Sequence, residues 1–271
     1  MRAPAAAKIN LALVVGPLRH DGKHEVFTVF QRVGLADRIE VEPAERTRVE
    51  GFPGDTLVRD ALERLAAHAA VDRRWYARIE KRIPVAAGLG GGSSDAATAL
   101  RLANDSLDEP VPPAELHDLA AELGSDVPYF LVDGPRLGSG DGTMLAPLDL
   151  PQDFWIVLAL PHHARKRSTA DVYAEFDARD GAHGWDARRA ALLDALDAVH
   201  RARDLAQLPP NDLVSSPLAA ELRALGAFRA DVSGAGPAVY GLYHHRRDAQ
   251  AARRAVKHVA RTWLTAPAWY G

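Results

Sequence analysis

Residues 84–97 read Pro-Val-Ala-Ala-Gly-Leu-Gly-Gly-Gly-Ser-Ser-Asp-Ala-Ala, and this stretch joins an alternating strand pattern to a helical one. Four glycines within five positions allow positive φ angles and a close approach of the backbone to a ligand. Ser93 or Ser94 is the predicted N-cap of the helix that follows. Since the first N–H groups of a helix attract anions, the stretch predicts a phosphate site. A serine-capped turn without a ligand is the alternative interpretation.

The stretch differs from the common nucleotide-binding motifs. G-x-G-x-x-G fails because Ser93 stands at the third glycine position. The residues from Gly16 to His24 imitate G-x-x-x-x-G-K-[ST] with one residue too many and without the final hydroxyl. A zinc-protease H-E-x-x-H motif ends at Thr28, which replaces its second histidine. These absences exclude the usual phosphate loop and the zinc-protease motif.

The rest of the chain predicts a mixture of strands and helices. Alternating apolar residues predict strands over 6–15, 25–33, 37–42, 75–83, 154–160, 228–232 and 238–243. Helical spacing predicts helices over 57–69, 94–107 and 113–123, and a last helix with Ala252, Val256, Val259 and Trp263 in phase. Residues 133–152 are rich in Gly, Pro and Asp and predict a linker or long turn. We therefore expect an α+β fold with two domains, 1–150 and 151–271.

Composition narrows the classes of function. The 271 residues carry a net charge of −3 and no cysteine. No basic field is present to attract nucleic acid, and disulfides and thiolate chemistry are excluded. The longest purely apolar run, 154–160, is far shorter than the ~20 residues that span a bilayer. We expect a cytoplasmic protein with neither a nucleic-acid nor a membrane partner.

Two charged residues and one small-residue loop are further candidates for chemistry. Asp126 lies between Gly124 and an apolar run, where a rigid carboxylate can accept a proton from a hydroxyl; a turn aspartate bonded to its own backbone is the alternative. Lys8 lies on a predicted strand and can stabilise phosphate or alkoxide charge; an ordinary solvent-facing lysine is the alternative. The loop 233–237 either lines a ligand or forms a tight turn.

Six segments together resemble the GHMP family of small-molecule kinases. They are 5–11, 21–25, 84–97, 123–130, 211–213 and 233–237. The resemblance implies an N-terminal domain like domain 2 of ribosomal protein S5, a ferredoxin-like C-terminal domain and an active site in the cleft between them. It also implies ATP and Mg²⁺ as cofactors, and transfer of the γ-phosphoryl group to a hydroxyl of a small CDP-linked substrate. The Mg²⁺ ligands stay unknown.

The resemblance assigns roles to individual residues. Asp126 is the expected general base, and Lys8 is expected to stabilise the alkoxide and the transferred phosphoryl group. The ATP phosphates are expected at Pro84, Val85, Ala86, Ala87, Gly88, Leu89, Gly90, Gly91, Gly92, Ser93 and Ser94. The CDP-linked substrate is expected at Asn10, His24, Tyr173, Ser233, Gly234 and Gly236, with His24 at the cytosine and Tyr173 stacked on it.

Two positions depart from the family pattern. Lys23 stands where the family usually has a tyrosine that forms the second face of the cytosine site. A lysine can lay its stem along a base or reach a phosphate, but it cannot stack as a ring does. Thr56 stands where an asparagine near the adenine pocket is usual. Lys23 makes a GHMP kinase with a shifted substrate the first alternative. A nucleotide-binding module without catalysis is the second alternative. We expect the chain to be a monomer or a weak homodimer.

Overall fold

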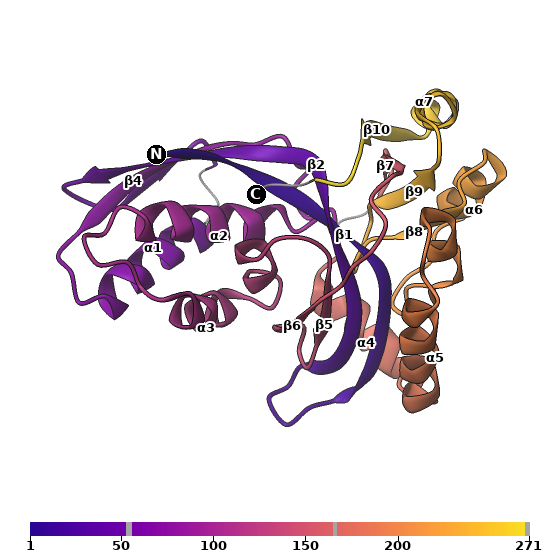
Figure 1. The fold of residues 1–271 in the computed structure, drawn as a ribbon, viewed down its shortest axis with the longest axis horizontal. Helices are drawn as coiled ribbons and strands as arrows, with labels where there is room; N and C mark the ends of the chain where they lie inside the picture. The colour runs from indigo at the N-terminus through magenta and orange to yellow at the C-terminus, as the bar shows by residue number, and fades with distance from the viewer. Residues whose placement is uncertain (53–55, 165–166, 269–271) are drawn as a thin grey trace.

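The structure is a computed structural model that describes residues 1–52, 56–164 and 167–268, and its strands form two sheets (Figure 1). The first sheet holds six strands in this described part of the chain: β1 (Arg2–Leu18), β2 (His24–Ala44), β3 (Arg48–Glu50), β4 (Arg74–Glu80), β5 (Arg136–Ser139) and β6 (Met144–Pro147). The order is β3-β4-β2-β5-β6, and β1 pairs with β2.

Strands β1 and β2 form one long antiparallel ribbon that curves through the middle of the molecule (Figure 1). The predicted strands 25–33 and 37–42 are one strand, since β2 runs without interruption from His24 to Ala44 and includes Gly34, where a break was expected. Gly34 instead allows a close approach: its N–H donates to the carbonyl of Ala266 at 3.0 Å, and a Cβ there would lie 2.9 Å from Thr265 Oγ1. The glycine marks a contact between the two ends of the chain.

Two helices, α1 (Leu57–His68) and α2 (Gly91–Asn104), cover one face of the first sheet, and α3 (Pro113–Leu123) packs against α1 on the side away from the sheet (Figure 1). The predicted serine cap of α2 is wrong. Its N-cap is Gly90, whose φ of 68° lies in the left-handed region that glycine favours, and no side chain caps the helix. Ser93 and Ser94 lie inside the first turn of α2. The predicted helix 113–123 is confirmed as α3, and Gly124 is its C-cap.

The predicted linker over 133–152 is wrong over residues 136–147. Strands β5 and β6 form a hairpin there, and β5 pairs with β2 so that Thr28 lies opposite Gly138. The turn signals at Gly140, Asp141 and Gly142 belong to the tip of this hairpin. The sequence pattern was correct about the turn, but four-residue strands are too short to show an alternation.

The second sheet has four antiparallel strands in the described residues, in the order β10-β7-β9-β8. They are β7 (Trp155–Pro161), β8 (Arg229–Val232), β9 (Val239–Tyr243) and β10 (Ala260–Thr265). The helices α4 (Thr169–Ala178), α5 (Trp185–Asp197), α6 (Pro217–Ala224) and α7 (Arg246–Ala255) follow or separate them, with 3₁₀ turns at 128–131, 202–207 and 256–258. The predicted last helix ends at Ala255, and Trp263 lies in β10 opposite Leu158.

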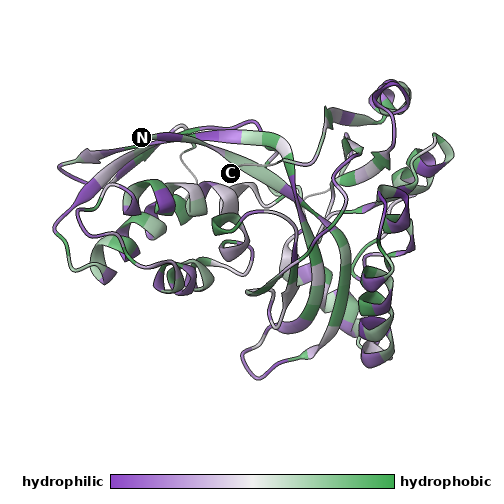
Figure 2. Ribbon diagram, in the orientation of Figure 1, coloured by the Kyte–Doolittle hydropathy of each residue, from purple (hydrophilic) through white to green (hydrophobic). Residues whose placement is uncertain are grey.

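Apolar packing joins the two sheets. Ile9 and Leu11 of β1 pack in one buried cluster with Ile156 of β7 and Tyr240 of β9. The curved lower parts of β1 and β2 are accordingly hydrophobic, whereas α7 is largely hydrophilic (Figure 2). The α+β class is confirmed, while the boundary at residue 150 stays a prediction. Among the described residues no helix has the length and apolarity needed to cross a membrane.

Candidate active site

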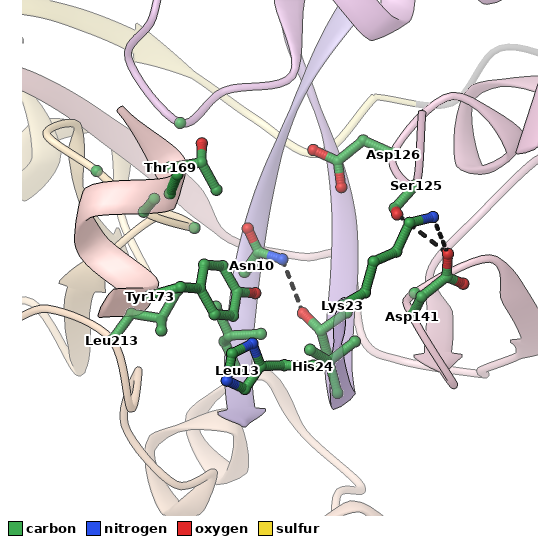
Figure 3. A pocket seen from close by; sticks show the side chains of 18 of the residues that line it. Asn10, Leu13, Lys23, His24, Ser125, Asp126, Asp141, Thr169, Tyr173 and Leu213 are labelled. Carbon is green, nitrogen blue, oxygen red and sulfur yellow. Dashed lines mark hydrogen bonds and ion pairs between the residues drawn. The ribbon is translucent and has the colours of Figure 1, made fainter. Parts of the chain in front are cut away.

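A cavity of about 720 Å³ opens where the β1–β2 ribbon, the glycine loop 84–90, the start of α2 and α4 meet. Figure 3 shows side chains from these elements pointing toward one space. The residues that line it include Lys8, Asn10, Lys23, His24, Ala86, Gly88, Gly90, Ser93, Ser125, Asp126, Asp141, Thr169, Tyr173, Gly234 and Gly236. The cavity therefore unites segments from both ends of the chain.

Lys8 and Asp126 meet in this cavity. Lys8 Nζ lies 3.2 Å from Asp126 Oδ2, and the lysine side chain is buried while 35% of the carboxylate side chain is exposed. Lys8 Nζ also donates to Asn10 Oδ1 at 2.7 Å. Both faces of β1 are covered at this point, so the solvent-facing interpretation of Lys8 is wrong. An ammonium has three donors, and one remains for a ligand once Asn10 and Asp126 take two.

A chain of hydrogen bonds holds Asn10 in place. Its Nδ2 donates to Thr28 Oγ1 at 2.7 Å, and that hydroxyl donates to the carbonyl of Ala12 at 2.9 Å. The backbone N–H of Asn10 donates to Ser233 Oγ at 3.3 Å, and Ser233 Oγ donates to the carbonyl of Gly88 at 2.8 Å. Ser233 is fully buried, so it joins β1 to the glycine loop from behind the cavity wall.

The glycine loop is fixed by close backbone contacts. A Cβ on Gly88 would lie 2.2 Å from the carbonyl oxygen of Ser233, and one on Gly90 would lie 2.8 Å from Phe130 Cζ and 3.0 Å from Lys8 Cγ. Both glycines have positive φ. A Cβ on Gly92 would meet nothing within 4 Å, so the first turn of α2 faces open space. Such a turn, with free N–H groups, suits a phosphate.

The eleven residues expected to hold phosphates divide into four groups. Ala86, Gly88, Gly90 and Ser93 line the cavity. Ala87, Leu89 and Ser94 are buried beneath it, whereas Val85 is 56% exposed. Pro84, Gly91 and Gly92 continue the loop and the first turn of α2 without lining the cavity. The structure thus gathers these residues at one place, and their role in binding stays a prediction.

His24 and Tyr173 lie together at another side of the cavity. Their ring centroids are 4.9 Å apart, and His24 Nε2 lies 2.8 Å from Asp177 Oδ1 of α4. Burial raises the pKa of Tyr173 to about 12, and the charge of Asp126 adds to this rise. The phenol therefore stays neutral at physiological pH. The two rings form an aromatic surface of the kind that binds a flat base.

Lys23 lies across the cavity from Tyr173 (Figure 3). Its Nζ donates to Asp141 Oδ2 at 2.5 Å, and Ser125 Oγ donates to the same oxygen at 3.3 Å. Thr143 donates to Asp141 Oδ1 through its hydroxyl, at 2.7 Å, and its N–H. Burial opposes the effect of these hydrogen bonds, but Lys23 and Thr143 together lower the pKa of Asp141 to about 2. This carboxylate stays charged.

A second lysine–carboxylate cluster lies under the glycine loop. Lys81 Nζ donates to Asp37 Oδ2 at 2.5 Å and to Asp95 Oδ2 at 2.7 Å, and both aspartate side chains have no exposed surface. Asp37 Oδ1 accepts hydrogen bonds from the N–H groups of Arg82 and Ile83, just before the loop. Burial raises the pKa of Asp95 to about 8; the Lys81 charge opposes this rise and the Asp37 charge adds to it.

Sequence reasoning missed several residues of the cavity. Asp141 was hidden in the supposed linker, although its Asp-Gly pair is a turn signal. Ser125 lies in the segment 123–130 but was given no role there, and Thr169 has no motif of its own; both line the cavity. Thr56, expected near an adenine pocket, is exposed at the start of α1 and is not among the residues that line this cavity.

The donors at the cavity fit a magnesium ion bound mainly through phosphates. Mg²⁺ keeps several waters and takes one or two protein oxygens beside phosphate oxygens. The Ser93 hydroxyl at the phosphate end and the half-exposed Asp126 are oxygens of this kind. The described residues contain no cluster of three or more His, Cys, Asp or Glu side chains that could hold a metal alone. A metal that arrives with its nucleotide is consistent with this set.

Two family models match this chain. The model described as "GHMP kinases N terminal domain" matches residues 56–134, and "GHMP kinases C terminal" matches residues 191–261. The first match includes the glycine loop, α2 and Asp126. The second includes the loop 233–237 and the strands β8 and β9.

Curated relatives match over most of their length. The 4-diphosphocytidyl-2-C-methyl-D-erythritol kinase of an Anaeromyxobacter species is 38% identical, over 93% of this chain and 85% of that protein. The protein of the same name from Bacillus cereus is 34% identical, over 89% of this chain and 87% of that protein.

Solved structures share the fold. A crystal structure of 4-(cytidine 5'-diphospho)-2C-methyl-D-erythritol kinase has a TM-score of 0.79 at 31% identity, covering 99% of this chain and 100% of that one. A mevalonate kinase at 12% identity has a TM-score of 0.74, over 98% of this chain and 99% of that one, which shows the likeness of fold alone. Together with the matched models and relatives, these likenesses establish that the chain belongs to the GHMP kinase family.

Proposed function

We propose that this enzyme transfers the γ-phosphoryl group of ATP to the 2-hydroxyl of 4-diphosphocytidyl-2-C-methyl-D-erythritol, a step of non-mevalonate isoprenoid precursor synthesis. The observation that carries the proposal is the Lys8–Asp126 pair, 3.2 Å apart in a cavity that also contains the glycine loop. The names of the 34–38% identical relatives supply the substrate.

Asp126 is the proposed general base. Its carboxylate is the half-exposed partner of the pair, so a substrate hydroxyl can reach it. Phosphoryl transfer depends mainly on positioning and on electrostatic stabilisation, and a base oriented by a neighbouring cation meets the first need. The proton of the hydroxyl passes to Asp126 as the oxygen attacks the γ-phosphorus.

Lys8 is the proposed electrostatic stabiliser. Its buried ammonium is held by Asn10 and Asp126, which leaves a donor for the attacking oxygen and the migrating phosphoryl group. The N–H groups at the start of α2 neutralise charge on the leaving ADP. Mg²⁺, held by the nucleotide phosphates and the Ser93 hydroxyl, would supply further neutralisation of phosphate charge.

The substrate end of the site is proposed at His24 and Tyr173. Asn10, Gly234 and Gly236 line the cavity between this end and the glycine loop, and Ser233 supports them from behind. We also propose that the reaction takes place in the cytoplasm, where ATP is supplied, and that the chain acts as a monomer or weak homodimer.

Product formation tests this proposal. Purified protein, Mg-ATP and the CDP-linked substrate are mixed, with Asp126→Asn as the matched control. We expect phosphorylated product in the wild type and a turnover at least ~10²-fold lower in the variant, because a positioned base contributes this much. Turnover within a few-fold of wild type in the variant would refute Asp126 as the base.

Two other outcomes separate the alternatives. Preferential phosphorylation of a non-nucleotide alcohol would indicate a GHMP kinase with a shifted substrate. Binding of ATP with no product from any alcohol would indicate a nucleotide-binding module without catalysis.

A further inference from the structure

We propose that Asp141 is a positioning residue that holds the ammonium of Lys23 away from the reacting groups, so that Lys23 contributes an apolar wall and not a second active-site charge. The inference rests on the proposed function, since it concerns the base subsite and the carboxylate of Asp126. It assigns a role to a residue outside all of the motifs described above.

Position is the first argument. Lys23 Nζ and Ser125 Oγ both donate to Asp141 Oδ2, and Ser125 directly precedes Asp126 in the chain. The lysine ammonium therefore lies beside the segment that carries the proposed base. Three side chains of this group, Lys23, Ser125 and Asp141, line the same cavity as Lys8 and Asp126.

The construction of the Asp141 site is the second argument. The Asp141 side chain is 13% exposed and accepts four hydrogen bonds, from Lys23, Ser125 and, twice, Thr143. Lys23 is 49% exposed, and an ion pair with such an exposed partner contributes little to stability. A rigid acceptor for a flexible lysine is better explained by control over where the charge rests.

Charge is the third argument. The cavity already holds one lysine–carboxylate pair, Lys8 and Asp126. A second free ammonium nearby would compete with Lys8 for the Asp126 oxygens and would also attract a substrate diphosphate. Asp141 prevents both effects by pairing with Lys23 at 2.5 Å. One catalytic cation then remains for the reacting oxygen.

Shape is the fourth argument. With its end fixed at Asp141, the Lys23 stem lies on the opposite side of the cavity from the Tyr173 ring (Figure 3). Lysine stems pack on apolar surfaces while the charged end is satisfied elsewhere. A base between the Tyr173 ring and this stem would have an aromatic face on one side and an aliphatic face on the other.

A double-mutant cycle tests the inference. Asp141→Asn removes the acceptor charge but keeps the size of the side chain, and Lys23→Met keeps the stem but removes the ammonium. CDP affinity is measured by calorimetry at low and high salt, and kcat is measured with the CDP-linked substrate. Asp72→Asn removes a solvent-exposed carboxylate that does not line the cavity, and it serves as the control for the loss of one negative charge.

The expected result follows from the freed ammonium. Asp141→Asn should make CDP binding more salt-dependent, because an unpaired Lys23 then attracts the diphosphate, and should lower kcat about tenfold. The double variant Lys23→Met/Asp141→Asn should regain both the salt dependence and the kcat of Lys23→Met alone, within about threefold. Thermal unfolding of each variant shows whether the hairpin tip is intact.

Other results overturn the inference. If the double variant keeps the defect of Asp141→Asn, the carboxylate acts only by folding the hairpin tip. If Asp141→Asn changes neither salt dependence nor kcat, Lys23 needs no partner. A wild type that binds no CDP and yields no product overturns the proposed function and this inference together, whereas an active wild type with an additive cycle overturns this inference alone.

Discussion

Two lysines lie beside neighbouring glycines where the glycine loop enters α2, yet their surroundings differ. Lys8 approaches Gly90 from the cavity and faces one half-exposed carboxylate, Asp126. Lys81 approaches Gly91 from below and contacts Asp37 and Asp95, both without exposed surface. A buried cluster can only stabilise the fold, because no substrate reaches its carboxylates. A pair with one open member can exchange its proton and its charge with a ligand.

The largest expected effect is on the open pair. Lys8→Met should lower kcat by ~10²- to 10³-fold, the range for loss of one charge-stabilising donor, and should weaken ATP binding far less. Asp126 keeps its access to solvent, but the buried Asn10 Oδ1 loses its donor, so the unfolding free energy should fall by about 1 kcal/mol. Steady-state kinetics and urea unfolding measure the two quantities. A change confined to apparent ATP affinity would contradict the role of Lys8.

The buried cluster of Lys81, Asp37 and Asp95 should respond in the opposite way. Lys81→Met leaves Asp37 and Asp95 without their shared cation in the interior, so we expect a loss of about 3 kcal/mol of unfolding free energy. Thermal and urea unfolding measure this loss, with Lys257→Met as a control at an exposed lysine. If Lys81→Met is as stable as wild type, the two clusters do not differ in the way described above.

A smaller effect is expected from pH. An aspartate whose folded-state pKa is raised to about 8 binds a proton more tightly in the folded state than in the unfolded one. The unfolding free energy should therefore fall as the pH rises from about 4 to about 8. Asp95→Asn removes this titrating group, so its stability should depend less on pH. Urea midpoints across that range compare the two proteins; parallel curves would show that Asp95 does not carry the dependence.

The smallest effect concerns two glycines at the start of α2, its N-cap Gly90 and Gly92 in its first turn. Gly90→Ala should destabilise the protein by about 1 kcal/mol and lower kcat, because its Cβ meets Phe130 and Lys8 and its φ is 68°. The Cβ added by Gly92→Ala has no atom within 4 Å, so this variant is the matched control for folding. We expect Gly92→Ala to raise the KM for ATP at unchanged stability if phosphates occupy that space. Equal effects of the two variants on stability would contradict this account.

The open site was more predictable from sequence than the buried one. The glycine loop, Lys8 and Asp126 have a local pattern and a family resemblance, and the structure brings them together. Asp37 and Lys81 have ordinary strand neighbours, and only the pairing of β2 with β4, which sets Arg38 opposite Glu80, brings them together. Asp95 reaches them from α2. Long-range pairings of this kind leave no periodic signal in a single sequence.

The fold errors have the same origin. Gly34 looks like a strand break in the sequence. In the structure it lets the backbone at Ala266 come within hydrogen-bond distance of β2. The predicted last helix was expected to include Trp263, but α7 ends at Ala255. Residues 260–265 pair with β7 instead, and this tertiary contact overrides the local pattern. The Gly90 cap of α2 depends on a positive φ, which the sequence permits without specifying.

Strand β1 passes through three different apolar surroundings within ten residues. Ala5 packs with the helices below the first sheet, Ile9 with strands of the second sheet, and Leu13 with Val172 and Phe176 of α4. This strand cannot fray without opening all three, so its amide hydrogens should exchange with solvent only when the whole molecule unfolds. We therefore expect Lys8 and Asn10 to belong to the most protected backbone of the protein, so that the proposed chemistry is anchored where the chain moves least.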